Sequence, residues 1–211
     1  MCFSATASFM ASGILATVGV LSIRSVKRWQ WYLFASVPLL FAIQQLSEGF
    51  VWLYGTSSAG SLAASIFLFF ALGIWPTVIP LAFLLVEPHM PRKILLGVLT
   101  LAGLSLSGFL LASLWYQAPE FSAQGCHIIY TFYPVIIFSF LPTLWTAVVY
   151  CLATIAPFFI SSKLHMKVFG ALIALSCIAA YLFFTIYFIS VWCFFAAIIS
   201  AVTIGVMHKN S

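Results

Sequence analysis

Long apolar runs separated by short polar segments dominate the pattern of this chain. The runs cover residues 3–23, 30–54, 61–86, 94–116, 128–160, 166–187 and 190–207. Each is close to or above the length of about 20 residues that an α-helix needs to cross a bilayer, and the segments between them are short. The pattern predicts an all-α, polytopic integral membrane protein in which residues 1–211 form a single domain of seven transmembrane helices.

Two parts of this pattern are irregular. Residues 166–207 contain one uninterrupted apolar stretch that we divide by length, and the run 128–160 is long for one span, so we expect a tilted or broken helix there. Prolines fall inside the third and fifth runs, at Pro76, Pro80, Pro134, Pro142 and Pro157. Each removes a helical hydrogen bond and frees a carbonyl that needs another partner.

The positive charges predict the orientation of the helices. With the N-terminus outside, the segments 24–29, 87–93, 161–167 and 208–211 face the cytoplasm and hold every Lys and Arg: Arg24, Lys27, Arg28, Arg92, Lys93, Lys163, Lys167 and Lys209. The opposite loops contain Glu120 and His127 but no Lys or Arg. This asymmetry follows the positive-inside rule and predicts a cytoplasmic C-terminus. The first run has no basic residue before it, so we interpret it as a retained helix and not as a cleaved signal peptide.

Composition supports the membrane assignment and excludes other classes. The chain is 64% hydrophobic and 5% charged, whereas soluble domains are about 25% charged. The net charge of +5 does not indicate nucleic-acid binding, because the basic residues are scattered at the ends of apolar runs. We predict a protein of the bacterial inner membrane whose partners are the lipid bilayer and a small ion or solute; its oligomeric state stays open.

Glu48 is the candidate functional residue. It lies six residues before Tyr54, about 9 Å below the end of the second predicted helix, where a carboxyl group facing lipid costs on the order of 2.5 kcal/mol or more. Gln44 and Gln45 precede it by four and three residues and can support it on the same helix. The alternative is a structural carboxyl group that joins two helices by hydrogen bonds worth about 1 kcal/mol.

The predicted topology gathers further reactive side chains near the outer face. Cys2, Cys126, His127 and Cys193 are expected there with Glu48, and Trp52 and Trp192 lie at the same boundary. Thiolate, imidazole and carboxylate groups suit zinc or copper, although their spacing matches no compact ligand motif. Alternatively, Cys126 and Cys193 form a disulfide, or either of them forms one with Cys2, because the outer compartment is oxidising. His127 has an equally simple structural interpretation at the end of the fifth run.

The inner segment Glu87–Lys93 is a weaker candidate. We expect a structural turn stiffened by two prolines, in which Glu87 pairs with Arg92 or Lys93. The sequence contains no Gly-rich phosphate loop, His-Glu-x-x-His, Cys-x-x-Cys or Gly-x-Ser-x-Gly motif. No familiar catalytic motif therefore assigns a reaction.

Several short segments carry a resemblance to a known family. They are Met1-Cys2-Phe3-Ser4-Ala5, the segment 45–52, Pro80-Leu81-Ala82 with Glu87-Pro88, and Ser190-Val191-Trp192-Cys193. Together they resemble an uncharacterised family of small bacterial multi-pass membrane proteins, which implies the architecture but no reaction. A weaker similarity links the seven spans to hydrolases of the alkaline ceramidase type. Those enzymes carry a histidine pair on a late helix, and the runs 166–187 and 190–207 contain no histidine.

Three functional hypotheses follow. The first is an outward-facing polar pocket around Glu48 that binds or transports a small ion or solute, such as a metal ion or a proton. The second is a metal-dependent intramembrane lipid hydrolase, which needs at least three converging metal ligands. The third is a non-catalytic assembly partner in which Glu48 serves as an interhelical lock.

Overall fold

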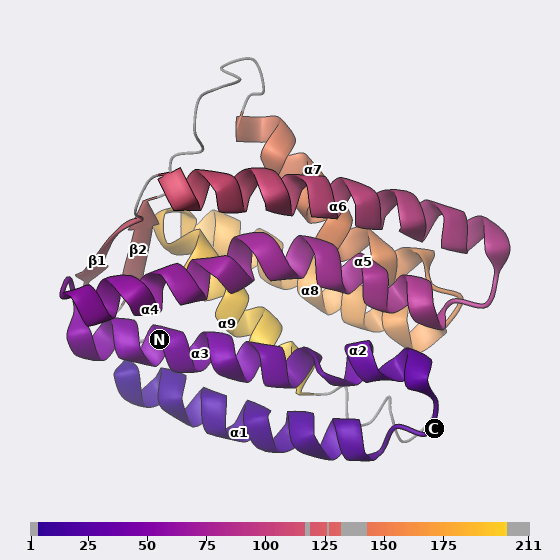
Figure 1. Cartoon of the computed structure of the whole chain (residues 1–211), viewed down its shortest axis with the longest axis horizontal. Helices are drawn as coiled ribbons and strands as arrows, with labels where there is room; N and C mark the ends of the chain where they lie inside the picture. The colour runs from indigo at the N-terminus through magenta and orange to yellow at the C-terminus, as the bar shows by residue number, and fades with distance from the viewer. Residues whose placement is uncertain (1–3, 117–118, 126, 132–142, 202–211) are drawn as a thin grey trace.

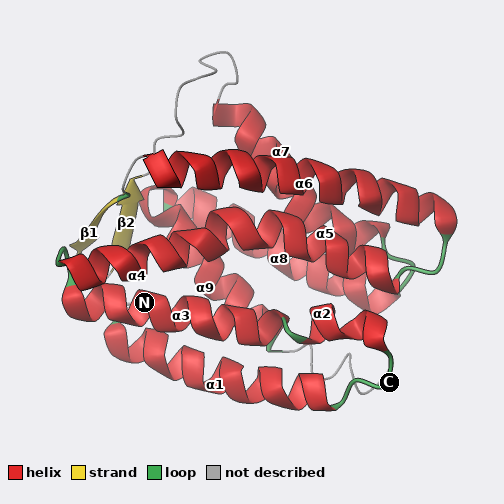
Figure 2. Cartoon of the chain, viewed as in Figure 1, coloured by secondary structure: helices red, strands yellow, loops and turns green. Residues whose placement is uncertain are grey.

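The computed structural model of the chain describes residues 4–116, 119–125, 127–131 and 143–201, and these are mostly helical (Figures 1 and 2). The elements are α1 (Ala5–Arg24), η1 (Trp29–Trp31), α2 (Tyr32–Ala35), α3 (Val37–Tyr54), α4 (Ser58–Leu68), η2 (Phe69–Ile74), α5 (Trp75–Val86), α6 (Met90–Tyr116), β1 (Glu120–Gln124), β2 (His127–Thr131), α7 (Thr143–Ile160), α8 (Leu164–Phe183), η3 (Thr185–Tyr187) and α9 (Phe188–Ser200).

Five helical segments are long and apolar enough to cross a membrane. They are Ala5–Arg24, Trp29–Tyr54, Ser58–Val86, Met90–Tyr116 and Leu164–Phe183, and two shorter apolar helices cover Trp145–Ile160 and Thr185–Ser200. Each of the seven predicted runs therefore contains a helix within the described part of the chain. The helical character is confirmed, and the long apolar helices are compatible with a membrane protein.

The prediction that the fifth helix begins near residue 128 is wrong. Residues His127–Thr131 form strand β2, which pairs antiparallel with β1 so that Gln124 lies opposite His127. The sequence His-Ile-Ile-Tyr-Thr is rich in β-branched and aromatic residues, and Gly125 has a φ of 60°, which suits a tight hairpin turn. An apolar run of this length does not by itself distinguish a strand from a helix.

The third run is broken where its prolines predicted a break. The π-helical segment η2 precedes α5, whose first turn contains Pro76 and whose interior contains Pro80. Side chains from other helices donate hydrogen bonds to carbonyl groups of this irregular backbone. Ser107 Oγ donates to the Gly73 carbonyl at 2.7 Å, and the Tyr150 hydroxyl donates to the Ala71 carbonyl at 2.5 Å. The break is thus filled by protein groups from α6 and α7.

The remaining boundaries agree broadly with the pattern. The 3-10 turn η3 separates α8 from α9 close to the expected division of the last stretch. Pro157 lies inside α7, whereas Pro134 and Pro142 lie outside the described residues. These boundaries place the first turn of α9 beside the hairpin, an arrangement that matters for the site described below.

Close helix packing brings α1 against α3. A Cβ atom on Gly19 would lie 2.7 Å from the backbone nitrogen of Leu39, and Ser12 Oγ donates to the Ala42 carbonyl at 2.8 Å. Small residues at such contacts let two helix backbones approach each other. The contact leaves the opposite face of α3 to meet α4 and α9.

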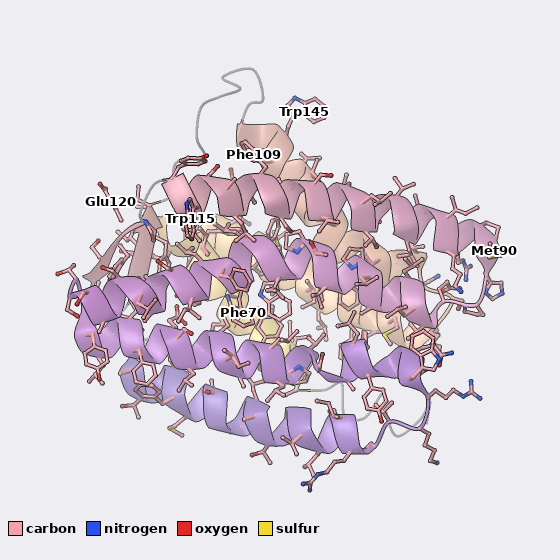
Figure 3. All side chains as sticks on the ribbon, in the orientation of Figure 1. Phe70, Met90, Phe109, Trp115, Glu120 and Trp145 are labelled. Carbon is pink, nitrogen blue, oxygen red and sulfur yellow. The ribbon has the colours of Figure 1, made fainter. Side chains whose placement is uncertain are left out.

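The two ends of the bundle differ in chemistry. Figure 1 places the C-terminal end of α1 and the loop between α5 and α6 at one end, and the β-hairpin at the other. In Figure 3, Met90 lies at the first end, and Trp115 and Glu120 lie at the second. The described Lys and Arg residues belong to the segments at the first end, which we call the basic end; the second is the hairpin end.

Candidate polar site around Glu48

Glu48 lies on α3 and faces the interior of the bundle. Its side chain is 1% exposed, and Gln44 and Gln45, one turn earlier on α3, are also fully buried. The spacing of three and four residues places these amides next to the carboxyl group along the helix. All three polar side chains predicted on this helix are therefore enclosed by protein.

Two hydrogen bonds tie this face of α3 to other helices. Ser190 Oγ, in the first turn of α9, donates to Glu48 Oε1 at 2.5 Å. The Trp75 indole Nε1 donates to Gln44 Oε1 at 2.8 Å. Because both bonds join residues far apart in sequence, the polar groups of α3 help to fix α5 and α9 in place.

Several buried polar atoms close to Glu48 have no hydrogen-bond partner of good geometry among the described residues. They are Gln44 Nε2, Gln45 Nε2 and Oε1, Trp52 Nε1, Tyr130 OH and Trp192 Nε1. We call these atoms together with the Glu48 carboxyl group the polar cluster. Of these groups, the Gln45 amide lies within hydrogen-bonding distance of Glu48, and the Gln44 amide within that of Cys193. A buried donor or acceptor left without a partner costs about 1–3 kcal/mol, so the indole and phenol groups keep hydrogen-bonding capacity that water or a bound molecule can use.

A cavity of about 240 Å³ lies between β2 and the turn that joins α8 to α9. Its walls are formed by Ile128, Tyr130, Thr185, Ile186, Tyr187, Phe188, Ile189 and Ser190. Ser190 lines this cavity and also donates to Glu48, while the Tyr130 hydroxyl belongs to the polar cluster. Ser190 therefore connects a wall of the cavity at the hairpin end with the Glu48 carboxyl group.

His127 lies on the hairpin and contacts the turn between α8 and α9. Its ring stacks on Tyr187, with centroids 4.4 Å apart, and lies against Phe184 at 5.3 Å. Burial of the ring lowers the pKa of His127 below its ordinary value, which favours the neutral imidazole. His127 thus packs on one wall of the cavity, and its role as a second ligand of the site stays a prediction.

The cysteines contribute less than the sequence suggested. Cys193 is a buried free thiol within hydrogen-bonding distance of the Gln44 side chain, whereas Cys2 and Cys126 lie outside the described residues. The Cys126–Cys193 disulfide therefore stays a prediction. No group of three or more His, Cys, Asp or Glu side chains within the described ranges is arranged to hold a metal ion. Zinc or copper binding thus stays a prediction that depends on the two undescribed cysteines.

The two predicted tryptophans lie beside the polar cluster. Trp52 follows Glu48 by four residues on α3, and Trp192 lies two residues after Ser190 on α9. Both pack in one hydrophobic cluster, in which the Trp192 ring lies 5.8 Å from that of Tyr150. A buried indole N–H group usually has a hydrogen-bond acceptor nearby, so the two tryptophans add donors to the polar cluster.

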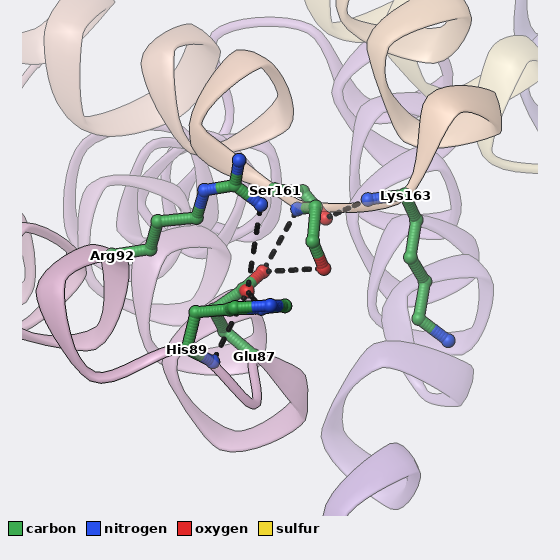
Figure 4. A network of polar contacts seen from close by, with 6 residues as sticks. Glu87, His89, Arg92, Ser161 and Lys163 are labelled. Atoms are coloured by element: carbon green, nitrogen blue, oxygen red, sulfur yellow. Dashed lines mark hydrogen bonds and ion pairs between the residues drawn. The ribbon is translucent and has the colours of Figure 1, made fainter.

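Glu87 forms a second buried polar site, at the basic end (Figure 4). One carboxylate oxygen accepts from the His89 ring Nδ1 at 3.0 Å and lies 3.9 Å from Arg92 Nη1. The other accepts from the Ser162 backbone N–H at 3.0 Å and from its hydroxyl at 3.3 Å. These contacts join the α5–α6 loop to the α7–α8 loop, so the expected structural turn is found, with a long-range partner in addition to Arg92.

Electrostatics at the basic end favour an ionised Glu87. Burial alone would raise the pKa of its carboxyl group, but the hydrogen bonds from Ser162 and His89 outweigh burial and hold the pKa below its ordinary value. Nearby, the Lys163 ammonium group lies 4.3 Å above the centre of the Trp31 ring. Burial lowers the pKa of Lys163, and the Glu87 carboxylate acts in the opposite direction.

Three residues of the Glu48 site were not selected from the sequence. Ser190 belongs to one of the segments that carried the family resemblance, but its hydroxyl was not assigned a role. Tyr130 was assigned to a helix, and its strand alternation with Ile128 would have indicated that both side chains face inward. Trp75 gave no signal, since its hydrogen bond to Gln44 depends on how α3 and α5 pack.

Comparison with known proteins identifies a family but no activity. No curated protein and no solved structure matches the chain. Nothing in these comparisons supports the similarity to alkaline ceramidases. The sequence profile of a family of unknown function, DUF6629, matches residues 1–211, in agreement with the resemblance to an uncharacterised family. With its whole length matched, this chain belongs to the family of unknown function DUF6629.

Proposed function

We propose that this chain is a multi-pass protein of the bacterial inner membrane that binds or moves a small ion or solute. In this proposal seven helices cross the membrane, the N-terminus lies outside and the C-terminus lies in the cytoplasm. The binding site is the polar cluster around Glu48, and it opens outward through the cavity at the hairpin end.

The distribution of charge supports this orientation. The described Lys and Arg residues belong to segments at the basic end, whereas the hairpin end carries Glu120 and His127. Basic loops are retained on the cytoplasmic side, so the cavity beside Ser190 would face the outside. The exposed Trp115 and Tyr116 at the end of α6 suit the outer membrane interface.

The observation that carries the functional proposal is the set of buried polar atoms without protein partners. A structural lock would need only the bonds from Ser190 and Gln45 to Glu48, and would leave no reason for the unpaired indoles and phenol around it. Polar groups placed inside a membrane protein commonly line a pathway for ions or solutes. The assembly-partner hypothesis therefore explains less of the site than solute binding does.

Each member of the cluster has a defined role in this proposal. The Glu48 carboxyl group binds a cation or exchanges a proton, and Ser190 orients it through Oε1. The unpaired indole N–H groups donate to the bound solute or to the water that accompanies it. Tyr130 and Ser190 form the passage between the cluster and the outer cavity.

Flux measurements with the Glu48→Gln variant test this function. Purified protein is reconstituted in lipid vesicles, and proton, sodium and zinc fluxes are followed with dyes trapped inside. We expect the wild-type protein to conduct at least one of these ions, and Glu48→Gln to reduce that flux about tenfold or more, because the amide neither ionises nor exchanges protons.

The matched control is Glu120→Gln, which makes the same chemical change at an exposed carboxylate of the hairpin. This variant should conduct like the wild type. Equal fluxes for the wild type and Glu48→Gln, or wild-type fluxes no higher than those of protein-free vesicles, would contradict the proposal.

A further inference from the structure

Two cysteines that the Glu48 site does not use meet across neighbouring helices. Cys151 lies on α7 and Cys177 on α8, and both are half-buried free thiols. Their side chains lie within hydrogen-bonding distance of each other. A single cysteine in such a place is usually a small apolar filler, but two thiols in contact can react together. We call Cys151 and Cys177 the dithiol pair.

The packing of α7 against α8 agrees with this contact. The two helices pack on each other and are joined by the short segment 161–163, so they run antiparallel. A Cβ atom on Gly170 would lie 2.6 Å from the Cβ atom of Phe158. Phe158 follows Cys151 by seven residues, and Gly170 precedes Cys177 by seven. Two helical turns take about seven residues, so the cysteines lie level with each other, on the same faces that meet at Gly170.

The contact at Gly170 brings the two helix backbones close together, because glycine leaves no side chain between them. Close approach is what a disulfide requires, since its two Cα atoms are usually about 4.4–6.8 Å apart. Cys151 and Cys177 belong to different helices, so a disulfide between them would join α7 to α8 covalently.

The dithiol pair lies beside apolar residues at the surface of the bundle. Leu152 and Ile178, which follow the two cysteines in sequence, are exposed. Val148 and Tyr181, about one turn further along the contact between α7 and α8, are also exposed. A reagent that moves over this apolar surface can therefore approach the pair.

The depth of the pair limits which reagents these are. Cys151 lies nine residues before Ile160, and Cys177 lies thirteen residues after Leu164, which is about 14 Å and 20 Å from the basic end of each helix. In the proposed orientation both thiols lie within the hydrocarbon layer, which is about 30 Å thick. The reagent has to dissolve in lipid, whereas charged thiols such as glutathione stay in water.

We propose that Cys151 and Cys177 are a redox-active pair that a lipid-soluble quinone oxidises to a disulfide. Two S–H bonds break and one S–S bond forms, and the two electrons and two protons that leave the sulfur atoms reduce the quinone to a quinol. This site is separate from the polar cluster around Glu48. The inference goes beyond the proposed function and shares with it only the location in a membrane.

Charge favours this chemistry over the other reactions of two thiols. The dithiol and the disulfide are both neutral, so neither form places charge in apolar surroundings. Two thiolates around a soft cation such as Cu(I) would carry a net negative charge, and the described Lys and Arg residues lie at the basic end. A hydroperoxide would pass through a polar sulfenic acid and release water into the same surroundings. A quinone takes up both hydrogens and releases no further product.

Thiol trapping in lipid vesicles tests the proposal. The full chain, with Cys2, Cys126 and Cys193 replaced by alanine, is reconstituted in phosphatidylcholine vesicles without oxygen and incubated with decylubiquinone. Free thiols are then blocked with N-ethylmaleimide, and the peptides are analysed by mass spectrometry. We expect a disulfide between Cys151 and Cys177, with one quinol formed for each disulfide. Without the quinone, both thiols should be recovered as maleimide adducts.

A matched control keeps two thiols but turns one of them away from the other. In Cys151→Ser/Leu152→Cys the thiol on α7 moves by one residue, which rotates it about 100° around the helix and onto the exposed surface. We expect the disulfide yield and the quinol formed to fall about tenfold or more. Where this variant alters the elution of the protein in size-exclusion chromatography, Cys177→Ser/Ile178→Cys makes the same displacement on α8.

The outcomes separate this inference from the proposed function. Thiols that stay reduced in the presence of the quinone overturn it, as does a displaced thiol that crosslinks as fast as the original pair. A disulfide that forms with cumene hydroperoxide but not with the quinone overturns it as well. In each of these cases a flux that depends on Glu48 leaves the proposed function standing. Formation of the disulfide with its quinol, together with fluxes that do not depend on Glu48, supports this inference and contradicts the proposed function alone.

Discussion

Glu48 and Glu87 are both buried carboxyl groups, exposed by 1% and 3%, yet their surroundings are opposite in kind. Glu87 accepts hydrogen bonds from His89 and Ser162 and lies near Arg92, so both of its oxygens have protein partners. Glu48 accepts a hydrogen bond from Ser190 and lies within hydrogen-bonding distance of the Gln45 amide, and the indole and phenol groups beside it lack a partner of good geometry among the described residues. Burial alone therefore does not indicate how completely the surroundings of a carboxyl group are paired by hydrogen bonds.

The difference lies in what each set of contacts accomplishes. The contacts of Glu87 join two loops at the basic end and give both of its carboxylate oxygens hydrogen-bond partners. The Glu48 region instead keeps indole and phenol donors without partners of good geometry among the described residues, beside the cavity at the hairpin end. A fully paired site stabilises the fold, whereas a site with unpaired donors keeps hydrogen-bonding capacity that the fold does not use.

The largest expected effect concerns access of reagents from outside. Ser190 and Ser161 are each 2% exposed, and they lie in the Glu48 and Glu87 regions, respectively. In a background in which the native cysteines are replaced, we expect Ser190→Cys to react with a membrane-impermeant maleimide at least about tenfold faster than Ser161→Cys, because Ser190 lines the outer cavity.

The measurement is the labelling rate in sealed cells and again in opened membranes, where reagent reaches both faces. A slow reaction at Ser161→Cys in opened membranes would show that the Glu87 region is closed and not merely on the far side. Equal rates for the two variants in opened membranes would remove the contrast between the regions.

A second expectation concerns stability and its dependence on pH. Glu87→Gln should lower the free energy of unfolding by about 1–3 kcal/mol at neutral pH, because the charged hydrogen bonds to Ser162 and His89 are weakened. The pKa of Glu87 is lowered by folding, so its stabilisation is complete above its ordinary pKa of about 4.3 and is lost as the pH falls through the lowered value.

The difference in thermal unfolding between the wild type and Glu87→Gln in detergent should therefore shrink as the solution is made acidic. Glu120→Gln, at an exposed position, serves as the control and should change stability by less than about 0.5 kcal/mol. A difference in unfolding temperature between the wild type and Glu87→Gln that stays constant as the pH falls would indicate that the carboxylate charge contributes nothing to stability.

The smallest expected effect tests whether the hydrogen bonds of the Glu48 region contribute to stability. Trp75→Phe removes the indole N–H that donates to Gln44 but keeps an aromatic ring to stack on Phe41. In the wild type, the centroids of the Trp75 and Phe41 rings lie 3.9 Å apart. We expect a loss of about 1 kcal/mol in the free energy of unfolding, together with the effect of the smaller ring. A loss as large as that of Glu87→Gln would mean that both regions hold the fold equally.

The sequence predicted the main helices because each is a long apolar run bounded by short polar segments. Each of the seven apolar runs contains a described helix, and the break before Pro76 and the division near η3 follow from local chemistry. It failed at residues 127–131, where an apolar run adjoining a longer one was assigned to the same helix. The strand there depends on pairing with β1, which is a contact between two segments and not a property of one.

For the site, the chain by itself determined that Glu48, Gln44 and Gln45 share one helix, because helical spacing is fixed by the backbone. Only the tertiary structure decided that Ser190, Trp75 and Tyr130 meet them, and that Cys193 lies beside Gln44 while His127 packs on Tyr187. The physical reason is that local periodicity determines which residues lie on one face of a helix. Which faces then meet is determined by the packing of helices that are far apart in sequence.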